Sequence, residues 1–102
     1  MFPEYYNKQG EIIDIEEWIK LNDNPNYRIV KQDELSNGKW VSTVLLGLDH
    51  NFGGGKPLIF ETMIFPSKGN LNEEYCQRYS TLYEAKIGHV EAVYLAQNNL
   101  IE

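Results

Sequence analysis

Apolar residues fill consecutive positions in the middle of the chain, and this pattern predicts buried β-strands. In the runs 40–47 and 58–65, odd and even positions both carry apolar side chains, which is typical of strands covered on two faces. The loop of residues 49–57 is short enough to make the two strands antiparallel neighbours. We therefore expect these strands to form the centre of a sheet.

Two flanking runs extend this sheet. Residues 27–32 have the composition of an exposed strand, and the pair Asn37-Gly38 that follows is the strongest short-range signal for a hairpin. Residues 75–79 add a strand after a polar turn at 67–70. The expected result is an antiparallel sheet of four to five strands.

The N-terminal segment predicts a short hairpin and a short helix. Residues 5–7 and 11–13 flank Gly10, which tolerates the positive φ of a tight turn. A helix is expected from Asp14 through Leu21, because a carboxylate at its start can cap the backbone N–H groups of the first turn.

A longer helix is predicted near the C-terminal end. Thr81 followed by Glu84 is a capping box, and helical spacing continues to about Gln97. The inner stripe of this helix holds mostly small residues, namely Leu82, Ala85, His89, Ala92 and Ala96, with Gly88 beside them. One helix covers only one sheet face, so the other apolar face must meet the N-terminal helix, a second copy of the chain or a target.

Length and charge restrict the class of protein. The 102 residues predict a single α+β domain over 1–102. The formal net charge is −6, and a surface of this sign repels phosphate backbones and anionic membranes. We expect no direct nucleic-acid binding and no membrane binding. The single cysteine, Cys76, excludes an internal disulfide, and Met1–Glu4 does not begin a signal peptide, so we expect a cytoplasmic location.

The most unusual stretch is the loop between the two central strands. Its candidate binding residues are Asp49, His50, Asn51, Phe52, Gly53, Gly54 and Gly55. Three consecutive glycines expose backbone N–H groups that can surround an anion, and Lys56 adds positive charge. The stretch matches neither the phosphate-loop nor the dinucleotide-binding fingerprint. Three interpretations stay open: a flexible hairpin loop, a cradle for a small nucleotide-like ligand, and a partner-docking loop with Phe52 as its anchor.

Glu61 stands among apolar residues, where a carboxylate without a partner is costly. Its candidate partners are Arg78, His50, Thr43 or a ligand. The carboxylate is interpreted as half of a salt bridge between neighbouring strands, as a group held for ligand or proton chemistry, or as a group exposed on an open sheet face. Glu61 and Arg78 therefore join the candidate binding residues.

A metal site is the alternative arrangement. Asp49, His50, Glu61 and His89 are residue types that bind Zn²⁺, and they converge only if the loop folds back over the sheet. His89 also has a simpler interpretation, a core histidine satisfied by hydrogen bonds. We expect no metal, no other cofactor and no catalytic residue, and we keep a small metal-assisted hydrolase using these four residues as the alternative.

The run Val41–Phe65, VSTVLLGLDHNFGGGKPLIFETMIF, resembles a family of small proteins encoded by bacteriophages and prophages. The similarity extends to residues 6–13, 78–85 and 88–89, so it covers most of the chain. Lys56 stands where relatives more often have a second proline. The family has no assigned activity or catalytic residues, so the resemblance implies a phage origin and a location in the host cytoplasm. Small accessory phage proteins commonly act by binding a host enzyme or a defence component.

Together these observations favour an accessory binding protein over an enzyme, and a structural protein of the virion is a third interpretation. We expect it to inhibit or sequester a host or defence factor, in the manner of a counter-defence protein, and to form a homo-oligomer. The uncovered sheet face would bind this partner, and the acidic surface would complement a basic groove in it. In a variant of this hypothesis, the glycine-rich loop and Glu61 hold a small nucleotide-like ligand.

Overall fold

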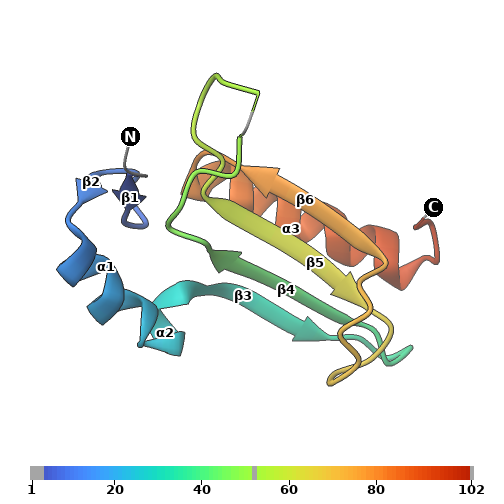
Figure 1. Ribbon diagram of the computed structural model, residues 1–102. Helices are drawn as coiled ribbons and strands as arrows, with labels where there is room; N and C mark the ends of the chain where they lie inside the picture. The colour runs from blue at the N-terminus through green and yellow to red at the C-terminus, as the bar shows by residue number, and fades with distance from the viewer. Residues whose placement is uncertain (1–3, 52, 102) are drawn as a thin grey trace.

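The structure is a computed structural model that describes residues 4–51 and 53–101. Its elements follow in the order β1 (Tyr5–Tyr6), β2 (Ile12–Ile13), α1 (Ile15–Asn22), α2 (Pro25–Arg28), β3 (Ile29–Glu34), β4 (Trp40–Leu45), β5 (Phe60–Phe65), β6 (Tyr75–Tyr79) and α3 (Leu82–Gln97). Strands β3 to β6 form a four-stranded antiparallel sheet in that spatial order, and α3 lies against one face (Figure 1). This α+β fold confirms the predicted architecture.

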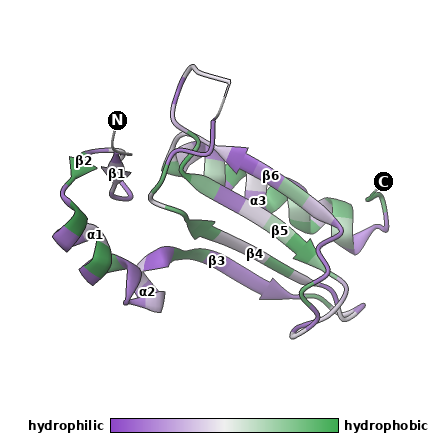
Figure 2. Ribbon diagram, in the orientation of Figure 1, coloured by the Kyte–Doolittle hydropathy of each residue, from purple (hydrophilic) through white to green (hydrophobic). Residues whose placement is uncertain are grey.

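The two central strands pair without a break in register, from Trp40 opposite Phe65 to Leu45 opposite Phe60. Because side chains alternate along a strand, one set points to α3 and the other to the open face. The set under α3 is buried and consists of Val41, Thr43, Leu45, Phe60, Thr62 and Ile64. The edge strands β3 and β6 are mostly hydrophilic (Figure 2).

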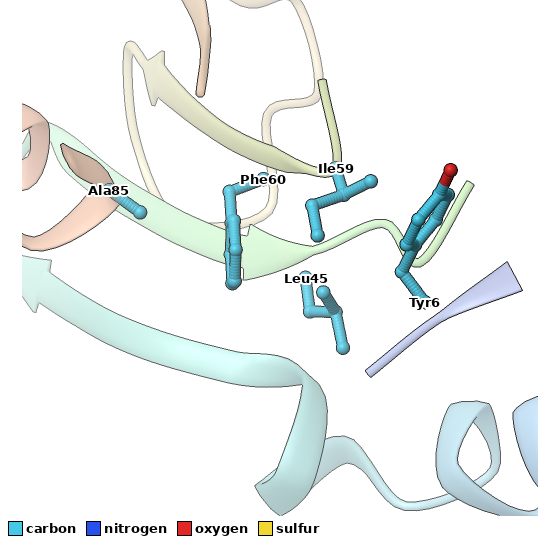
Figure 3. Close-up of a cluster of buried hydrophobic side chains, with 5 residues drawn as sticks. All are labelled: Tyr6, Leu45, Ile59, Phe60 and Ala85. Atoms are coloured by element: carbon cyan, nitrogen blue, oxygen red, sulfur yellow. The ribbon is translucent and has the colours of Figure 1, made fainter. Parts of the chain in front are cut away.

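Two hydrophobic clusters make up the core between the sheet and α3. The first runs from Ala85 on α3 through Phe60, Leu45 and Ile59 to Tyr6 on β1 (Figure 3). The second joins β4 and β5 to the far end of the helix and comprises Val41, Ile64, Ala92 and Ala96. Each large aliphatic or aromatic side chain that is fully buried contributes about 1.5–3 kcal/mol.

Small residues on α3 let the helix lie close to the sheet, as the sequence predicted. Gly88 is buried, and a Cβ placed on it would overlap the ring and hydroxyl of Tyr79 on β6. The helix begins with the predicted capping box, in which Thr81 accepts a hydrogen bond from the Glu84 backbone N–H and the Glu84 carboxylate accepts one from Thr81.

The N-terminal hairpin and α1 form as predicted, and they lie beside the sheet instead of over its open face (Figure 1). The Tyr6 N–H donates to the Gly47 carbonyl at 2.9 Å, and the Trp18 indole fits against Gly47. The centroids of the Tyr5 and Trp18 rings lie 4.9 Å apart. Helix α1 packs on β1 and α2, so among the described elements no helix covers the open face of the sheet.

Several strand boundaries differ from the sequence prediction. Strand β3 runs to Glu34 instead of residue 32, and β5 begins at Phe60 instead of residue 58. Residues 27 and 28 are helical and not part of a strand, because Asn24 caps a helical turn that Pro25 begins with its fixed φ. Strand β4 ends at Leu45 and not at Gly47, which adopts a φ of +75°. That left-handed conformation turns the chain out of the strand and toward the glycine-rich loop.

Across the described ranges, no helix is long and apolar enough to cross a membrane.

Candidate functional site

A chain of hydrogen bonds crosses the interior from β5 to β3 through α3. The Thr62 and Thr43 hydroxyls lie 2.5 Å apart, and Thr43 Oγ1 lies 2.7 Å from His89 Nδ1. On its other side, His89 Nε2 lies 2.7 Å from Asp33 Oδ2. His89 is only 3% exposed, so the predicted core histidine with hydrogen bonds is confirmed.

The Asp33 carboxylate determines how protons are arranged along this chain when His89 is neutral. The carboxylate only accepts, so Nε2 carries the hydrogen and Nδ1 accepts from the Thr43 hydroxyl. Thr43 then accepts from the Thr62 hydroxyl. Every polar atom between Thr62 and Asp33 has a partner in this arrangement, which is what burial of so many polar groups requires.

The order acid, imidazole, hydroxyl is that of a catalytic triad, yet the geometry does not suit nucleophilic catalysis. Thr43 and Thr62 are both 0% exposed, because they lie under α3 in the centre of the sheet. A nucleophile must reach a substrate as well as its base. The chain of hydrogen bonds therefore positions α3 and holds Asp33 at the surface, where 38% of its side chain is exposed.

Asp33 and His89 form the polar floor of a groove between β3 and α3. The groove encloses a cavity of about 470 Å³, a size typical of small-molecule sites. Its apolar walls are formed by Val30, Leu35, Val90 and Val93, and its charged rim by Lys31 and Lys86. We call it the β3–α3 groove.

Positive charge gathers at one end of the β3–α3 groove. Lys8 donates from Nζ to the Ile29 carbonyl at 3.2 Å and lies 4.9 Å from the Tyr27 ring centroid. Burial lowers the pKa of Lys8, and the ammonium of Lys86 nearby lowers it further. Lys8, Lys31 and Lys86 thus form a local positive region on a chain whose net charge is −6.

The glycine-rich loop projects from the end of the sheet (Figure 1). Asp49 fixes its base, where the carboxylate accepts hydrogen bonds from the backbone N–H groups of Asn51 at 2.7 Å and Leu58 at 2.9 Å. The Asn51 side chain donates to the Lys56 carbonyl at 3.0 Å. Gly53, Gly54 and Gly55 are exposed, and the last two have φ values of +85° and +93°.

His50 and Phe52 are further candidate residues of this loop. The His50 backbone N–H donates to Leu58 across the base of the loop at 3.0 Å. Phe52, the expected aromatic anchor, lies outside the described residues. Asp49 and Asn51 direct their polar atoms to the loop backbone, so their contacts shape the loop. A ligand or partner site here stays a prediction.

Glu61 forms the salt bridge expected between neighbouring strands. Its Oε2 accepts a hydrogen bond from Arg78 Nε at 2.9 Å, and the Cys76 thiol lies 3.5 Å from the same oxygen. The Glu61 side chain is 10% exposed and that of Arg78 39%, so the arginine covers the carboxylate on the open face. Burial, with Glu61 adding to it, raises the pKa of the Cys76 thiol.

The four residues of the alternative metal site do not come together. Glu61 pairs with Arg78 on the open face, while His89 lies on the opposite face between Thr43 and Asp33. Within residues 4–51 and 53–101, no group of three His, Cys, Asp or Glu side chains is arranged to hold a metal ion. The structure thus gives no support to a metal-assisted hydrolase built from Asp49, His50, Glu61 and His89.

The β3–α3 groove could not be predicted from the sequence. Lys31 lies in the predicted exposed strand of residues 27–32 and Asp33 follows it directly. Nothing in their spacing indicates that they meet His89 and Lys86, more than fifty residues away. One signal was present: a histidine on a stripe of small residues needs a polar partner from another element. Asp33 and Thr43 are those partners.

Comparisons of the chain with protein-family models, with curated proteins and with solved structures gave no match.

Proposed function

We propose that the protein is a binding protein whose β3–α3 groove takes a small acid with an apolar body. The observation that carries this proposal is the combination of an apolar cavity of about 470 Å³ with a lysine on each wall. Sites for small molecules are mostly apolar, with a few polar groups that fix the orientation of the ligand. The groove has both features.

The charges of the groove favour an acid. Lys31 comes from β3 and Lys86 from α3, so the two ammonium groups stand on opposite walls. The opposing charge on the floor is Asp33, whose Oδ2 is engaged by His89. A carboxylate bound to Lys31 leaves its hydrocarbon part against Val30 and Val93. A charge-assisted hydrogen bond of this kind contributes ~1.5 kcal/mol or more.

The experiment compares decanoate with decanol, which has the same chain length without the charge. Decanoate is expected to raise the melting temperature in a concentration-dependent way and to bind at least about tenfold more tightly than decanol. Lys31→Glu is expected to reduce decanoate binding by a similar factor. Equal binding of acid and alcohol, or no binding of either, contradicts the proposal.

Lys56→Glu is the matched control, because it reverses one charge in the glycine-rich loop and leaves the groove intact. Decanoate binding is expected to stay unchanged in this variant. If Lys56→Glu abolishes binding while Lys31→Glu does not, the loop is the ligand site and the groove is not. The same pair of variants, titrated with ATP, tests the nucleotide-like ligand expected for the loop.

The resemblance to phage proteins gives this proposal a setting. A phage accessory protein in the host cytoplasm that sequesters a small host acid would deprive a host or defence factor of its ligand. Plating efficiency of a phage that carries the wild-type chain or Lys31→Glu tests this role. The informative hosts are those that restrict a phage lacking the gene. If the phage with Lys31→Glu plates on all of them as well as the phage with the wild-type chain, sequestration through the groove is contradicted.

The open face of the sheet favours a second candidate function, direct binding of a partner protein. Trp40, Val44, Met63 and Phe65 are partly buried there around the Glu61–Arg78 pair, and no helix of the described chain covers them. An apolar centre with a polar rim is the usual anatomy of an interface. Met63→Glu is expected to abolish capture of such a host or defence protein, while Lys31→Glu leaves it intact.

A further inference from the structure

The outer face of α3 carries large apolar side chains that point to solvent. Tyr83 is 74% exposed, Ile87 43%, Val90 68% and Tyr94 60%. Their spacings of four, three and four residues place them in one line along the helix, which we call the outer stripe. This is the spacing of core positions in a two-stranded coiled coil.

The opposite side of the same helix is already buried against the sheet. Ala85, Gly88, His89, Ala92 and Ala96 face β4 and β5, so α3 is apolar on both sides. A helix with apolar side chains on two opposite sides normally has both sides covered. A contiguous exposed stripe on such a helix marks an interaction surface.

Two charged residues of opposite sign flank the outer stripe. Lys86 lies on the flank toward β3, where it lines the β3–α3 groove. Glu91 lies on the flank toward β6, where its charge contributes to the raised pKa values of Tyr75 and Tyr79. Neither Lys86 nor Glu91 forms an ion pair with another residue of the described chain.

We propose that a second copy of this chain covers the outer stripe, with the two α3 helices parallel and in register. Lys86 comes directly before Ile87, a position of the outer stripe. In a parallel pair, a residue at this place contacts the residue five places further along the other helix. Lys86 would therefore contact Glu91 of the second copy, and the twofold axis repeats this ion pair. The antiparallel alternative brings Glu84 toward Glu91 of the second copy and leaves Lys86 beside Val93, so the charges favour the parallel pair.

A hollow on α3 fits the same arrangement. A cavity of about 440 Å³ opens between Val90, Glu91, Tyr94 and Leu95. In a parallel pair, the side chain at a stripe position enters a hole formed by the neighbouring stripe positions and one flanking residue. Val90 of the second copy would enter the hollow, and Glu91 at its edge would meet Lys86.

The length of the contact sets the expected strength of the dimer. Helix α3 has 16 residues and is thus about 24 Å long, which gives a small interface. The sheet holds each helix in shape before association, so no ordering of the helix opposes dimerisation. We expect a reversible dimer whose population rises with concentration.

Sedimentation velocity over a concentration series, with three charge variants, tests the ion pair. Lys86→Glu and Glu91→Lys each place like charges across the interface twice and are expected to weaken dimerisation at least about tenfold. The double variant Lys86→Glu/Glu91→Lys restores opposite charges and is expected to recover the dimer. Both positions are exposed, and the far-ultraviolet circular dichroism of each variant checks that the fold is kept.

A cross-linking experiment tests the orientation. In a Cys76→Ser background, Tyr94→Cys is expected to form an intermolecular disulfide under mild oxidation, because equivalent stripe positions meet in a parallel pair. In an antiparallel pair, the two copies of residue 94 lie at opposite ends of the contact and cannot cross-link.

Three results would overturn the proposal: a monomer at every concentration, failure of the double variant to restore association, or absence of the Tyr94→Cys cross-link. The first result would assign the outer stripe to a different protein. Glu91→Lys also separates this inference from ligand binding, since Glu91 lies on the flank away from the groove and its substitution is expected to leave decanoate affinity unchanged.

Discussion

Gly88 of α3 lies directly against the ring of Tyr79 on β6, with no room for a methyl group between them. The contact fixes the distance between the helix and the sheet edge. It also explains why the inner stripe of α3 needs a glycine at a position where alanine would favour the helix.

Gly88→Ala is expected to destabilise the protein. Alanine improves helix propensity by about 1 kcal/mol, but the added Cβ overlaps the Tyr79 ring, and overpacking of this kind costs about 1–3 kcal/mol. We expect the steric term to win, because the overlapping atoms belong to a rigid ring. Urea unfolding measures the free energy. The second substitution Tyr79→Leu is expected to recover part of the loss, and a Gly88→Ala variant more stable than the wild type would contradict this packing.

Thr43→Val is expected to cost about 1–3 kcal/mol, because it leaves the buried His89 Nδ1 without a hydrogen bond. Thr43→Ser keeps the hydroxyl and removes one buried methyl group, so it serves as the control and is expected to cost only about 1 kcal/mol. Chemical denaturation of both variants gives the comparison. Equal losses would show that the methyl group, and not the hydroxyl, stabilises this position.

Stability is expected to fall in alkaline solution because of Tyr79. Burial raises the pKa of Tyr79 from 10.0 to about 12 in the folded state. Between pH 10 and 12 the unfolded chain loses this proton and the folded chain keeps it. The contribution is therefore complete below pH 10 and is lost as the pH rises toward 12.

Tyr79→Phe is the control for this pH dependence. Its unfolding free energy is expected to decline less steeply above pH 10 than that of the wild type. The slope is not expected to vanish, because burial also raises the pKa values of Tyr6 and Tyr75. The Tyr79 hydroxyl lies close to Thr62 but makes no hydrogen bond of normal geometry, so the substitution is expected to cost little stability at neutral pH.

The Cys76 thiol is expected to react with iodoacetamide more slowly than exposed cysteines usually do. Burial of the sulfur and the Glu61 carboxylate both raise its pKa, which lowers the fraction of reactive thiolate. Glu61→Gln removes the negative charge and is expected to increase the rate of alkylation. An unchanged rate in Glu61→Gln, measured by mass spectrometry, would show that the carboxylate does not influence the thiol.

Much of the fold could be predicted from local signals. The capping residues Asp14 and Thr81 begin the helices where expected, and Gly38 closes the β3–β4 hairpin with a φ of +90°. Each signal acts within a few residues, so it survives in the folded chain. Arg28 is the counterexample. It belongs to a run with the composition of a strand, but it is helical because Asn24 and Pro25 begin a helical turn just before it.

The functional surfaces could be predicted only in part. The sequence predicts that Glu61, a carboxylate among apolar residues, needs a partner, and Arg78 is one of the predicted partners. The β3–α3 groove depends on how far α3 covers the edge strand, which no residue spacing encodes. The exposed Ile87 and Val90 on α3 could not be predicted either, because helical periodicity does not show which of two apolar stripes is buried against the sheet.

The hydrogen-bond chain from Thr62 to Asp33 has a consequence for local opening. It links β5, β4, α3 and the edge strand β3 through a single imidazole ring. If either α3 or β3 detaches from the sheet, buried polar groups in the interior lose their hydrogen-bond partners. These elements should therefore exchange their amide hydrogens with solvent as one cooperative unit, whereas the glycine-rich loop exchanges independently and much faster.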